Sequence, residues 1–260
     1  MTLIASHRGG RDLWPENSRL AFRHTAEMDV DLVEFDVHQT RDEVLVVHHD
    51  ATIDRMTSGH GPIGDMTYEE LSRHIIIGTG GETIPTLVEV IDIMRPSKVN
   101  LRVEIKARQD GTTYDNMERH LLRLLSESGM ATRSMITSFQ LPSLEAFLSA
   151  LDEHGLASDD LLGALWLCSP STMAQLGFRG ILSCLSTFDV REIGLRADAI
   201  DDHLAALFDA HDIKLHAWAA HTSEAARTMF RLGIASFTSD RPDLAIAARS
   251  EHRSGLFAWA

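Results

Sequence analysis

The sequence predicts a closed (β/α)8 barrel with a small insertion after its second strand. Short β-like runs alternate with helical patterns along nearly the whole chain of 260 residues. Such alternation is typical of parallel strands joined by helices. About eight barrel strands can be counted, which favours a closed barrel over an open sheet. We therefore expect a single barrel domain over residues 1–260.

In the first half of the chain, short apolar runs indicate strands and apolar residues near helical spacing indicate helices. Leu121, Leu122 and Leu125 show that spacing. The strands predicted here are Leu3–Ser6, Asp31–His38, Val44–His48 and Leu101–Ala107, and the helices run from Pro15 to about Met28 and over Tyr114–Ser128. We expect the second and third of these strands to pair with or extend each other.

The second half continues the alternation. Its predicted strands are Ser134–Ser138, Leu161–Leu167, Gly180–Cys184, Ile213–Ala219 and Ala235–Thr238, with Gly180–Cys184 the weakest signal. Its predicted helices are Ser143–His154, a short one from Ser171, Asp201–His211, Ser223–Leu232 and Pro242–Arg249.

The alternation is interrupted between Asp50 and Ile84. Six glycines lie in this stretch: Gly59, Gly61, Gly64, Gly78, Gly80 and Gly81. The stretch is too short to bury a core of its own. We expect residues 50–84 to form a loop-rich insertion near the mouth of the barrel.

The charge of the chain argues against polyanionic partners. It carries 38 acidic and 24 basic residues, a formal net charge of −14. A field of that sign disfavours nucleic acid and anionic membrane surfaces. No apolar run approaches the roughly 20 residues of a membrane span, so we expect no stable membrane insertion. An anionic small molecule remains compatible if positive charge gathers at its site.

Targeting signals and cysteines are unremarkable. Thr2–Ser6 resembles a strand rather than a secretory signal, and we expect a cytoplasmic protein. Cys168 and Cys184 lack metal or redox spacing and are expected to be free thiols. The apolar tail Leu256–Ala260 is expected to cap the barrel or contact a second subunit, which leaves a homo-oligomer possible.

Three carboxylates occur on strands with alternating polarity. Glu34 and Asp36 share one face of their strand, because side chains alternate between faces. Glu104 and Lys106 repeat the pattern on another strand. Adjacent carboxylates are costly unless a cation or a shared proton relieves them. Oxygen ligands suit hard cations, so we expect one divalent ion, Mg²⁺ or Ca²⁺, at Glu34, Asp36 and Glu104.

Histidines end two of the predicted strands. His7 ends the first, and either His48 or His49 ends another; spacing alone does not choose between the last two. Catalytic residues of barrel enzymes cluster at strand C-termini, and histidine exchanges protons near neutral pH. Arg8 offers a forked donor for phosphate oxygens, and Lys106 could contact phosphate or neutralise the carboxylates. Two histidines beside a metal suit phosphodiester cleavage.

These motifs, in this order, resemble the glycerophosphodiester phosphodiesterase family. In the N-terminal half the shared patterns are His7-Arg8-Gly9, Pro15-Glu16-Asn17-Ser18, Ala21-Phe22, Glu34-Phe35-Asp36-Val37, Thr40, Val46-Val47-His48-His49-Asp50 and Arg55-Met56-Thr57. Further matches are Ile84-Pro85-Thr86-Leu87, Glu104-Ile105-Lys106, Ser138-Phe139, Trp218 and Thr238-Ser239-Asp240-Arg241-Pro242. The stretch Leu141–Lys214 matches weakly.

The resemblance implies roles for individual residues. It implies a metal held by Glu34, Asp36 and Glu104, His7 and His49 as the acid–base pair, Arg8 and Lys106 as phosphate contacts, and Trp218 as a wall near the substrate alcohol. The chain departs from the family at Trp218-Ala219-Ala220-His221, where the family often has Trp-Thr-x-Asn. That departure places His221 where an asparagine is common.

We therefore predict a metal-dependent hydrolase that cleaves a small phosphodiester, releasing glycerol 3-phosphate and an alcohol such as choline or ethanolamine. One alternative is a phospholipase D-like enzyme acting on lysophospholipids or sphingomyelin, which an exposed apolar rim on the insertion would favour. The Gly, Thr and Asp content of that segment favours a deacylated substrate instead. Another alternative is a catalytically silent barrel used for binding.

Overall fold

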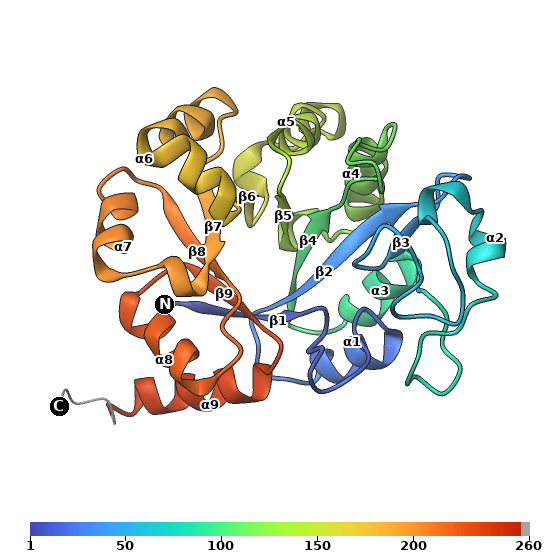
Figure 1. The fold of residues 1–260 in the computed structure, drawn as a ribbon, viewed down its shortest axis with the longest axis horizontal. Helices are drawn as coiled ribbons and strands as arrows, with labels where there is room; N and C mark the ends of the chain where they lie inside the picture. Colours follow the sequence, from blue (N-terminus) through green and yellow to red (C-terminus); the bar gives the residue numbers. More distant parts are fainter. Residues whose placement is uncertain (256–260) are drawn as a thin grey trace.

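The computed structural model describes residues 1–255 and forms the expected closed barrel (Figure 1). The strands are β1 Leu3–His7, β2 Leu32–Gln39, β3 Leu45–Val47, β4 Asn100–Ile105, β5 Ser134–Ser138, β6 Gly163–Leu167, β7 Glu192–Arg196, β8 Lys214–Trp218 and β9 Ser236–Ser239. The helices are α1 Arg19–Ala26, α2 Tyr68–Leu71, α3 Leu87–Met94, α4 Met117–Glu127, α5 Leu141–Ser149, α6 Pro170–Thr187, α7 Asp202–Asp209, α8 Ser223–Leu232 and α9 Pro242–Arg253. The predicted apolar tail lies outside the described residues.

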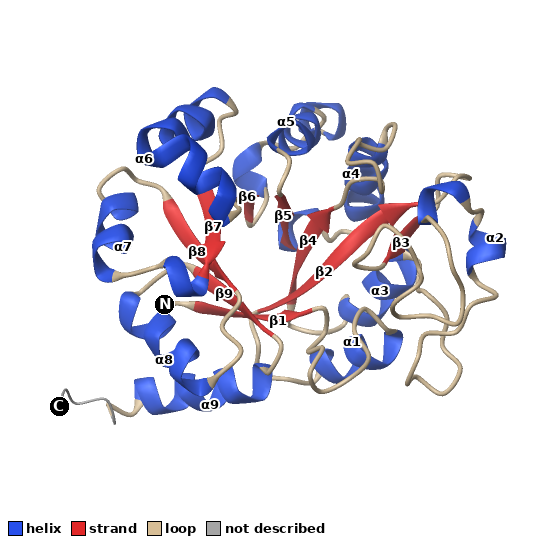
Figure 2. Cartoon of the chain, viewed as in Figure 1, coloured by secondary structure: helices blue, strands red, loops and turns tan. Residues whose placement is uncertain are grey.

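The ring closes between the first strand and its two neighbours. β1 pairs in parallel with both β2 and β9, and the other barrel strands follow in the order β4, β5, β6, β7, β8. Helices surround the ring (Figure 2). β3 is antiparallel to β2 and extends the sheet outside the closed ring.

Alternation along β2 separates the core from the interior of the barrel. Val33, Phe35 and Val37 are fully buried and belong to the large apolar cluster that includes the helices. Glu34 and Asp36 alternate with them and therefore face inward. A smaller apolar cluster, which includes Ala5, Leu32, Met135 and Leu165, fills the inside of the ring. The polar face predicted for this strand is confirmed.

One predicted strand is wrong. Gly180–Cys184 lies within α6, where Ile181 and Leu185 are buried four positions apart on one helical face. Gly177 adopts a left-handed conformation (φ 60°) and separates two helical parts of α6, so the apolar run starts a new helical stretch. The strand that completes the ring is instead β7.

Two short helices were not predicted. α2 lies in the insertion, and α3 follows it. Each begins with a reciprocal capping box, formed by Thr67 with Glu70 and by Thr86 with Glu89. The capping box of α3 precedes a run of apolar, largely β-branched residues in which no clear helical period can be recognised.

The insertion packs around a small apolar cluster that it shares with β3. Ile53, Ile63, Leu71 and Ile84 are fully buried there together with Val46 from β3. The insertion is thus anchored to the strand that pairs with β2. None of the helices within residues 1–255 is long and apolar enough to cross a membrane.

Candidate active site

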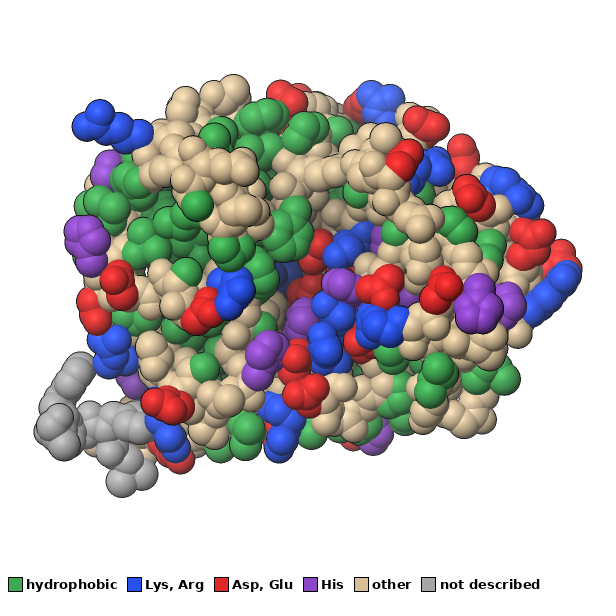
Figure 3. All heavy atoms as spheres, in the orientation of Figure 1, with side chains coloured by type: hydrophobic (Ala, Val, Ile, Leu, Met, Phe, Trp, Pro, Cys, Tyr) green, Lys and Arg blue, Asp and Glu red, His purple; other side chains and the backbone are tan. Residues whose placement is uncertain are grey.

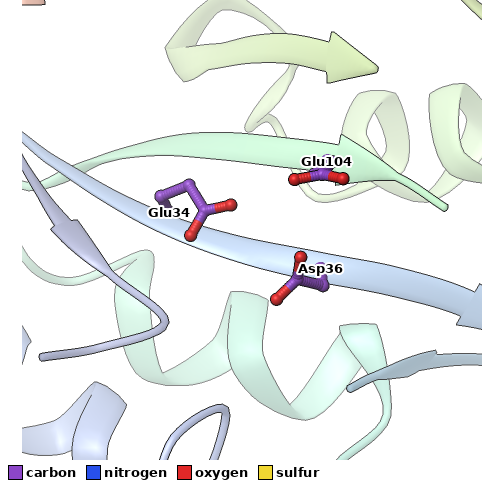
Figure 4. A group of neighbouring side chains, drawn as sticks. All are labelled: Glu34, Asp36 and Glu104. Carbon is purple, nitrogen blue, oxygen red and sulfur yellow. The ribbon is translucent and has the colours of Figure 1, made fainter. Parts of the chain in front are cut away.

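Three buried carboxylates meet inside the ring. Glu34 and Asp36 come from β2 and Glu104 from β4, and the strand register places Asp36 beside Glu104. One oxygen from each residue lies within 4.8 Å of the others. Figure 4 shows the three side chains directed toward a common space. The expected grouping is therefore present in the structure.

Cations and one amide surround these carboxylates. Lys106 Nζ lies 2.8 Å from Glu104 Oε1 and 3.3 Å from Asp36 Oδ1. Arg8 Nε lies 3.5 Å from Asp36 Oδ2, to which Asn17 Nδ2 donates a hydrogen bond of 2.9 Å. These contacts hold the carboxylates in place.

The pKa values of Glu34 and Asp36 are shifted in opposite directions. Burial, together with the charges of Asp36 and Glu104, raises the pKa of Glu34 well above its usual value. Burial also acts to raise the pKa of Asp36, but the charges of Lys106, His49 and Arg8 outweigh it and hold that pKa low. In the absence of a bound cation, Glu34 therefore tends to be protonated.

The donor set fits a divalent metal ion. All three groups offer carboxylate oxygens, which hard cations prefer. Asp36 Oδ1 is buried and, apart from the ion pair with Lys106 Nζ, has no hydrogen-bond partner within the part of the chain that the structure describes. A buried acceptor left in this state is costly, and a cation between the three oxygens would satisfy it.

His7 lies at the end of β1, held by a distant carboxylate. Its Nδ1 donates a hydrogen bond to Asp240 Oδ1, because a carboxylate can only accept. Its Nε2 lies 3.8 Å from Glu34 Oε2. The Nδ1 contact leaves Nε2 free to exchange a proton on the side of the carboxylates.

Asp240 has a well-stabilised negative charge. Burial acts to raise its pKa, but hydrogen bonds from His221 and His7 outweigh burial and keep the pKa well below its usual value. In the sequence, Asp240 stands within the Thr238–Pro242 motif, and no local pattern indicates a role for it. Its partnership with His7 is visible only in the fold.

The structure distinguishes between the two neighbouring histidines. His49 lines the central cavity, and its Nδ1 lies 2.6 Å from Asp50 Oδ1. His48 is buried, bonds through Nε2 to the carbonyl of Thr52, and has its pKa lowered by burial to about 4. Of the two histidines, His49 therefore lines the cavity and His48 does not.

The turn after β1 positions Arg8 through its backbone. The backbone of Arg8 is in the left-handed region (φ 50°), and so is that of Gly9 (φ 78°). A Cβ atom on Gly9 would lie 2.8 Å from the Cβ of Ala21 on α1. The turn therefore requires glycine there. Arg8 Nη1 bonds to Glu16 Oε1 at 3.1 Å, so its guanidinium is held on both sides by acids.

The cavity at the mouth has two unlike sides. Its volume is about 500 Å³. The lining residues include the expected His7, Arg8, Glu34, His49, Glu104, Lys106 and Trp218, together with Arg11, Arg196 and His221, to which sequence analysis gave no role. Figure 3 shows acidic, basic and histidine side chains gathered on one side of the hollow, whereas hydrophobic side chains predominate on the other. Five Lys or Arg side chains and three acidic side chains line the cavity, so its lining is richer in positive charge than the acidic protein as a whole.

An aromatic pair forms part of the apolar side. Trp218 and Phe139 make an edge-to-face contact with ring centroids 5.5 Å apart. Trp218 Nε1 donates to the carbonyl of Gly194 at 3.1 Å, which fixes the indole against the barrel. Trp218 therefore forms part of the cavity lining, and its role as a wall near the substrate alcohol stays a prediction.

Arg102 lies at the floor of the same cavity. It is fully buried, and the only hydrogen bond of its side chain among the described residues reaches Ser236 Oγ at 3.4 Å. Its charge lies near Glu34 and Glu104 without forming a close ion pair.

The chain is similar to known proteins over nearly its whole length. Residues 7–244 match the model of the glycerophosphoryl diester phosphodiesterase family. The chain belongs to the glycerophosphoryl diester phosphodiesterase family. The predicted family and the predicted enzyme class, a glycerophosphodiester phosphodiesterase, are both confirmed.

Individual relatives extend over the whole chain. A glycerophosphodiester phosphodiesterase of Caldanaerobacter subterraneus subsp. tengcongensis is 30% identical and aligns over 94% of this chain and 96% of its own. A solved structure from Agrobacterium tumefaciens, assigned to the glycerophosphoryl diester phosphodiesterases, is 37% identical with a TM-score of 0.90 and covers 98% of this chain and 99% of that one.

A more distant structure shares the fold. It is a phosphodiesterase of Oleispira antarctica in complex with its product sn-glycerol-3-phosphate. It is 20% identical, has a TM-score of 0.78 and covers 96% of this chain and 97% of its own. The predicted barrel of this phosphodiesterase-family chain is thus confirmed.

Proposed function

We propose that this phosphodiesterase-family enzyme hydrolyses glycerophosphodiesters to glycerol 3-phosphate and an alcohol, using a divalent metal ion and the histidines His7 and His49. One observation carries the proposal. Two histidines, each held by a carboxylate, line the same cavity as Glu34 and Glu104 of the three-carboxylate group. The sn-glycerol-3-phosphate bound by the Oleispira antarctica relative supports the product class.

Glu34, Asp36 and Glu104 would hold the metal, with Mg²⁺ or Ca²⁺ favoured by the all-oxygen donor set. When bound, such an ion polarises a phosphoryl oxygen. Arg8 and Lys106 line the cavity beside these ligands and would contact the phosphate. Arginine suits this role because its N–H groups match phosphate oxygens in pairs.

The two histidines divide the proton transfers. One removes a proton from the attacking hydroxyl, and the other protonates the departing alcohol oxygen. Attack by water gives glycerol 3-phosphate directly. Attack by the glycerol 2-hydroxyl first gives a cyclic phosphate, which water then opens. The alcohol would leave along the apolar side formed with Trp218.

The test measures glycerol 3-phosphate released from glycerophosphocholine, glycerophosphoethanolamine and glycerophosphoinositol after EDTA treatment and again with added Mg²⁺ or Ca²⁺. We expect turnover only with metal, and about a hundredfold loss or more in His7→Ala and His49→Ala. Phosphorus NMR during turnover would detect the cyclic phosphate if it forms. Wild-type turnover in both variants would contradict the acid–base assignment.

A second substrate class has one observation in its favour. Ile75 and Ile77 in the insertion are 46% and 59% exposed, as expected for an apolar rim that receives a lysophospholipid. Neither residue lines the described cavity, so we favour the deacylated substrate. Lysophosphatidylcholine in the same assay separates the two classes. Inactivity on every substrate with every metal would instead indicate a silent barrel.

A further inference from the structure

Asp240 lies between two histidines. His7 Nδ1 bonds to Oδ1, whereas His221 Nδ1 lies 3.0 Å from the other oxygen, Oδ2. Arg11 Nε lies 3.6 Å from Oδ2. Each oxygen of this carboxylate therefore has a separate partner.

His221 also reaches the backbone of Asp240. The Asp240 N–H lies 3.3 Å from His221 Nδ1. With a proton on Nδ1, His221 donates to Oδ2; without one, Nδ1 accepts from the main chain. In both forms His221 holds Asp240, either by its side chain or by its backbone.

The carboxylate needs such a restraint because its last torsion is soft. The χ2 angle of aspartate occupies a broad, roughly two-fold distribution. A contact at Oδ1 alone would let the group rotate away from the plane that His7 requires. A second contact at Oδ2 fixes the plane, and His7 with it, since the imidazole follows its acceptor.

The location of His221 fits this task. It follows β8 and precedes α8, its side chain is 44% exposed, and its ring centroid lies 6.3 Å from that of His7. It also stands where the family resemblance expects asparagine. An asparagine amide can donate to a carboxylate too, so the two residues share one chemical capability.

We propose that His221 is a positioning residue for His7 and acts through Asp240. The inference rests on the proposed function, because it assumes that His7 exchanges a proton during turnover. Loss of His221 then leaves the proposed phosphate contacts of Arg8 and Lys106 in place and reduces the fraction of His7 in a productive orientation. The effect falls on kcat rather than on KM.

The experiment compares His221→Ala with His221→Asn on the glycerophosphodiester that wild-type enzyme hydrolyses best, in the metal-loaded enzyme. We expect kcat to fall about ten- to hundredfold in His221→Ala, the size expected for a hydrogen bond to a charged group, with KM within about twofold. His221→Asn should recover most of the loss. His60→Ala is the matched control, because it removes an exposed histidine that lies 3.2 Å from Asp54 in the insertion.

A double-mutant cycle tests the route through Asp240. If His221 acts through that carboxylate, His221→Ala should add little in an Asp240→Asn background. The inference is overturned if the losses in kcat from His221→Ala and Asp240→Asn multiply in the double variant. It is also overturned by wild-type kcat in His221→Ala, by a rise in KM alone, or by failure of His221→Asn to restore kcat. The variant His7→Ala distinguishes failure of the proposed function from failure of this inference. Wild-type activity in His7→Ala would contradict the proposed function. An inactive His7→Ala together with a fully active His221→Ala would contradict only the role of His221.

Discussion

Arg55 and Glu16 are joined by two hydrogen bonds that connect the insertion with the mouth of the barrel. Arg55 Nη2 lies 2.7 Å from Glu16 Oε1, and Nη1 lies 3.2 Å from Oε2. Arg55 Nε also bonds to Asp50 Oδ2 at 2.6 Å. One side chain in the insertion thus supports both the partner of Arg8 and the partner of His49.

Removal of the Arg55 side chain should weaken catalysis, although we assign this residue no contact with the substrate. In Arg55→Met, Glu16 and Asp50 lose a shared cation, so Arg8 and His49 are held less firmly. We expect kcat/KM to fall about tenfold, a moderate value because water screens this partly exposed group. Steady-state kinetics check it. Arg73→Met, which removes an exposed pair with Glu69, should retain wild-type kinetics; an equal loss there would contradict the explanation.

Metal binding should stabilise the fold. The three inward carboxylates repel one another when no cation separates them, so a divalent ion binds the folded chain preferentially. At a concentration of metal about a hundred times its Kd, we expect Tm to rise by roughly 5–10 °C. Thermal unfolding after EDTA treatment, with and without Mg²⁺ or Ca²⁺, measures the shift. The shift should vanish in Glu104→Gln and persist in Glu153→Gln, an exposed carboxylate; an unchanged shift in Glu104→Gln would refute the ligand assignment.

Lys106 should act as the internal counter-ion of the metal-free enzyme. Burial acts to lower the pKa of Lys106, but the charges of Glu104 and Asp36 raise it above its usual value. Lys106→Met leaves buried carboxylates unpaired, a loss of about 3 kcal/mol in the unfolding free energy of the metal-free protein. Added metal should therefore raise Tm more in the variant than in wild type. Lys98→Met, at an exposed site, is the control, and an equal or smaller shift in Lys106→Met would show that Lys106 does not fulfil this role.

His216 should make folding sensitive to mild acid. It is fully buried and bonds to Ser236 Oγ at 2.7 Å and Glu192 Oε2 at 3.0 Å. Burial lowers the pKa of His216 below the ordinary 6.5, although the hydrogen bond with Glu192 opposes the shift. Below pH 6.5 the unfolded chain therefore binds a proton that the folded chain does not, and stability falls as the pH decreases toward the folded pKa.

The measurement is the slope of unfolding free energy against pH. In His216→Gln the slope between pH 6.5 and 5.5 should decrease by up to about 1.4 kcal/mol per pH unit, the contribution of one proton. Denaturant unfolding at several pH values provides it. His203→Gln, at an exposed position of α7, should leave the slope unchanged. The prediction fails if the two variants behave alike.

Much of the barrel could be predicted because its strands are locally distinctive. The alternation in Glu34-Phe35-Asp36-Val37 predicts both a strand and its inward face, and the structure places both carboxylates there. β7 escaped prediction because Glu192 and Gly194 interrupt the apolar pattern of a short strand. The run Gly180–Cys184 was mistaken for that strand, since a short apolar run does not distinguish strand from helix. The capping signal at Thr86 and Glu89 could have revealed α3.

The candidate site also has one part that could be predicted from the sequence and one part that could not. Residues on strand ends, such as His7 and Glu104, could be placed together because parallel strands bring their carboxyl ends to one edge. Their supporting partners could not, since Asp240, Glu16 and Arg55 meet the site through contacts between distant segments. No local pattern encodes such contacts.

The pairing of His7 with Asp240 has a consequence for shortened forms of the enzyme. The two residues lie 233 positions apart, and β1, which carries His7, hydrogen-bonds to β9, which ends one residue before Asp240. A chain that stops before β9 has every carboxylate of the acidic group, but it lacks the strand that pairs with one edge of β1 and the carboxylate that holds His7. We therefore expect such a shortened chain to be inactive, although it retains all three carboxylates.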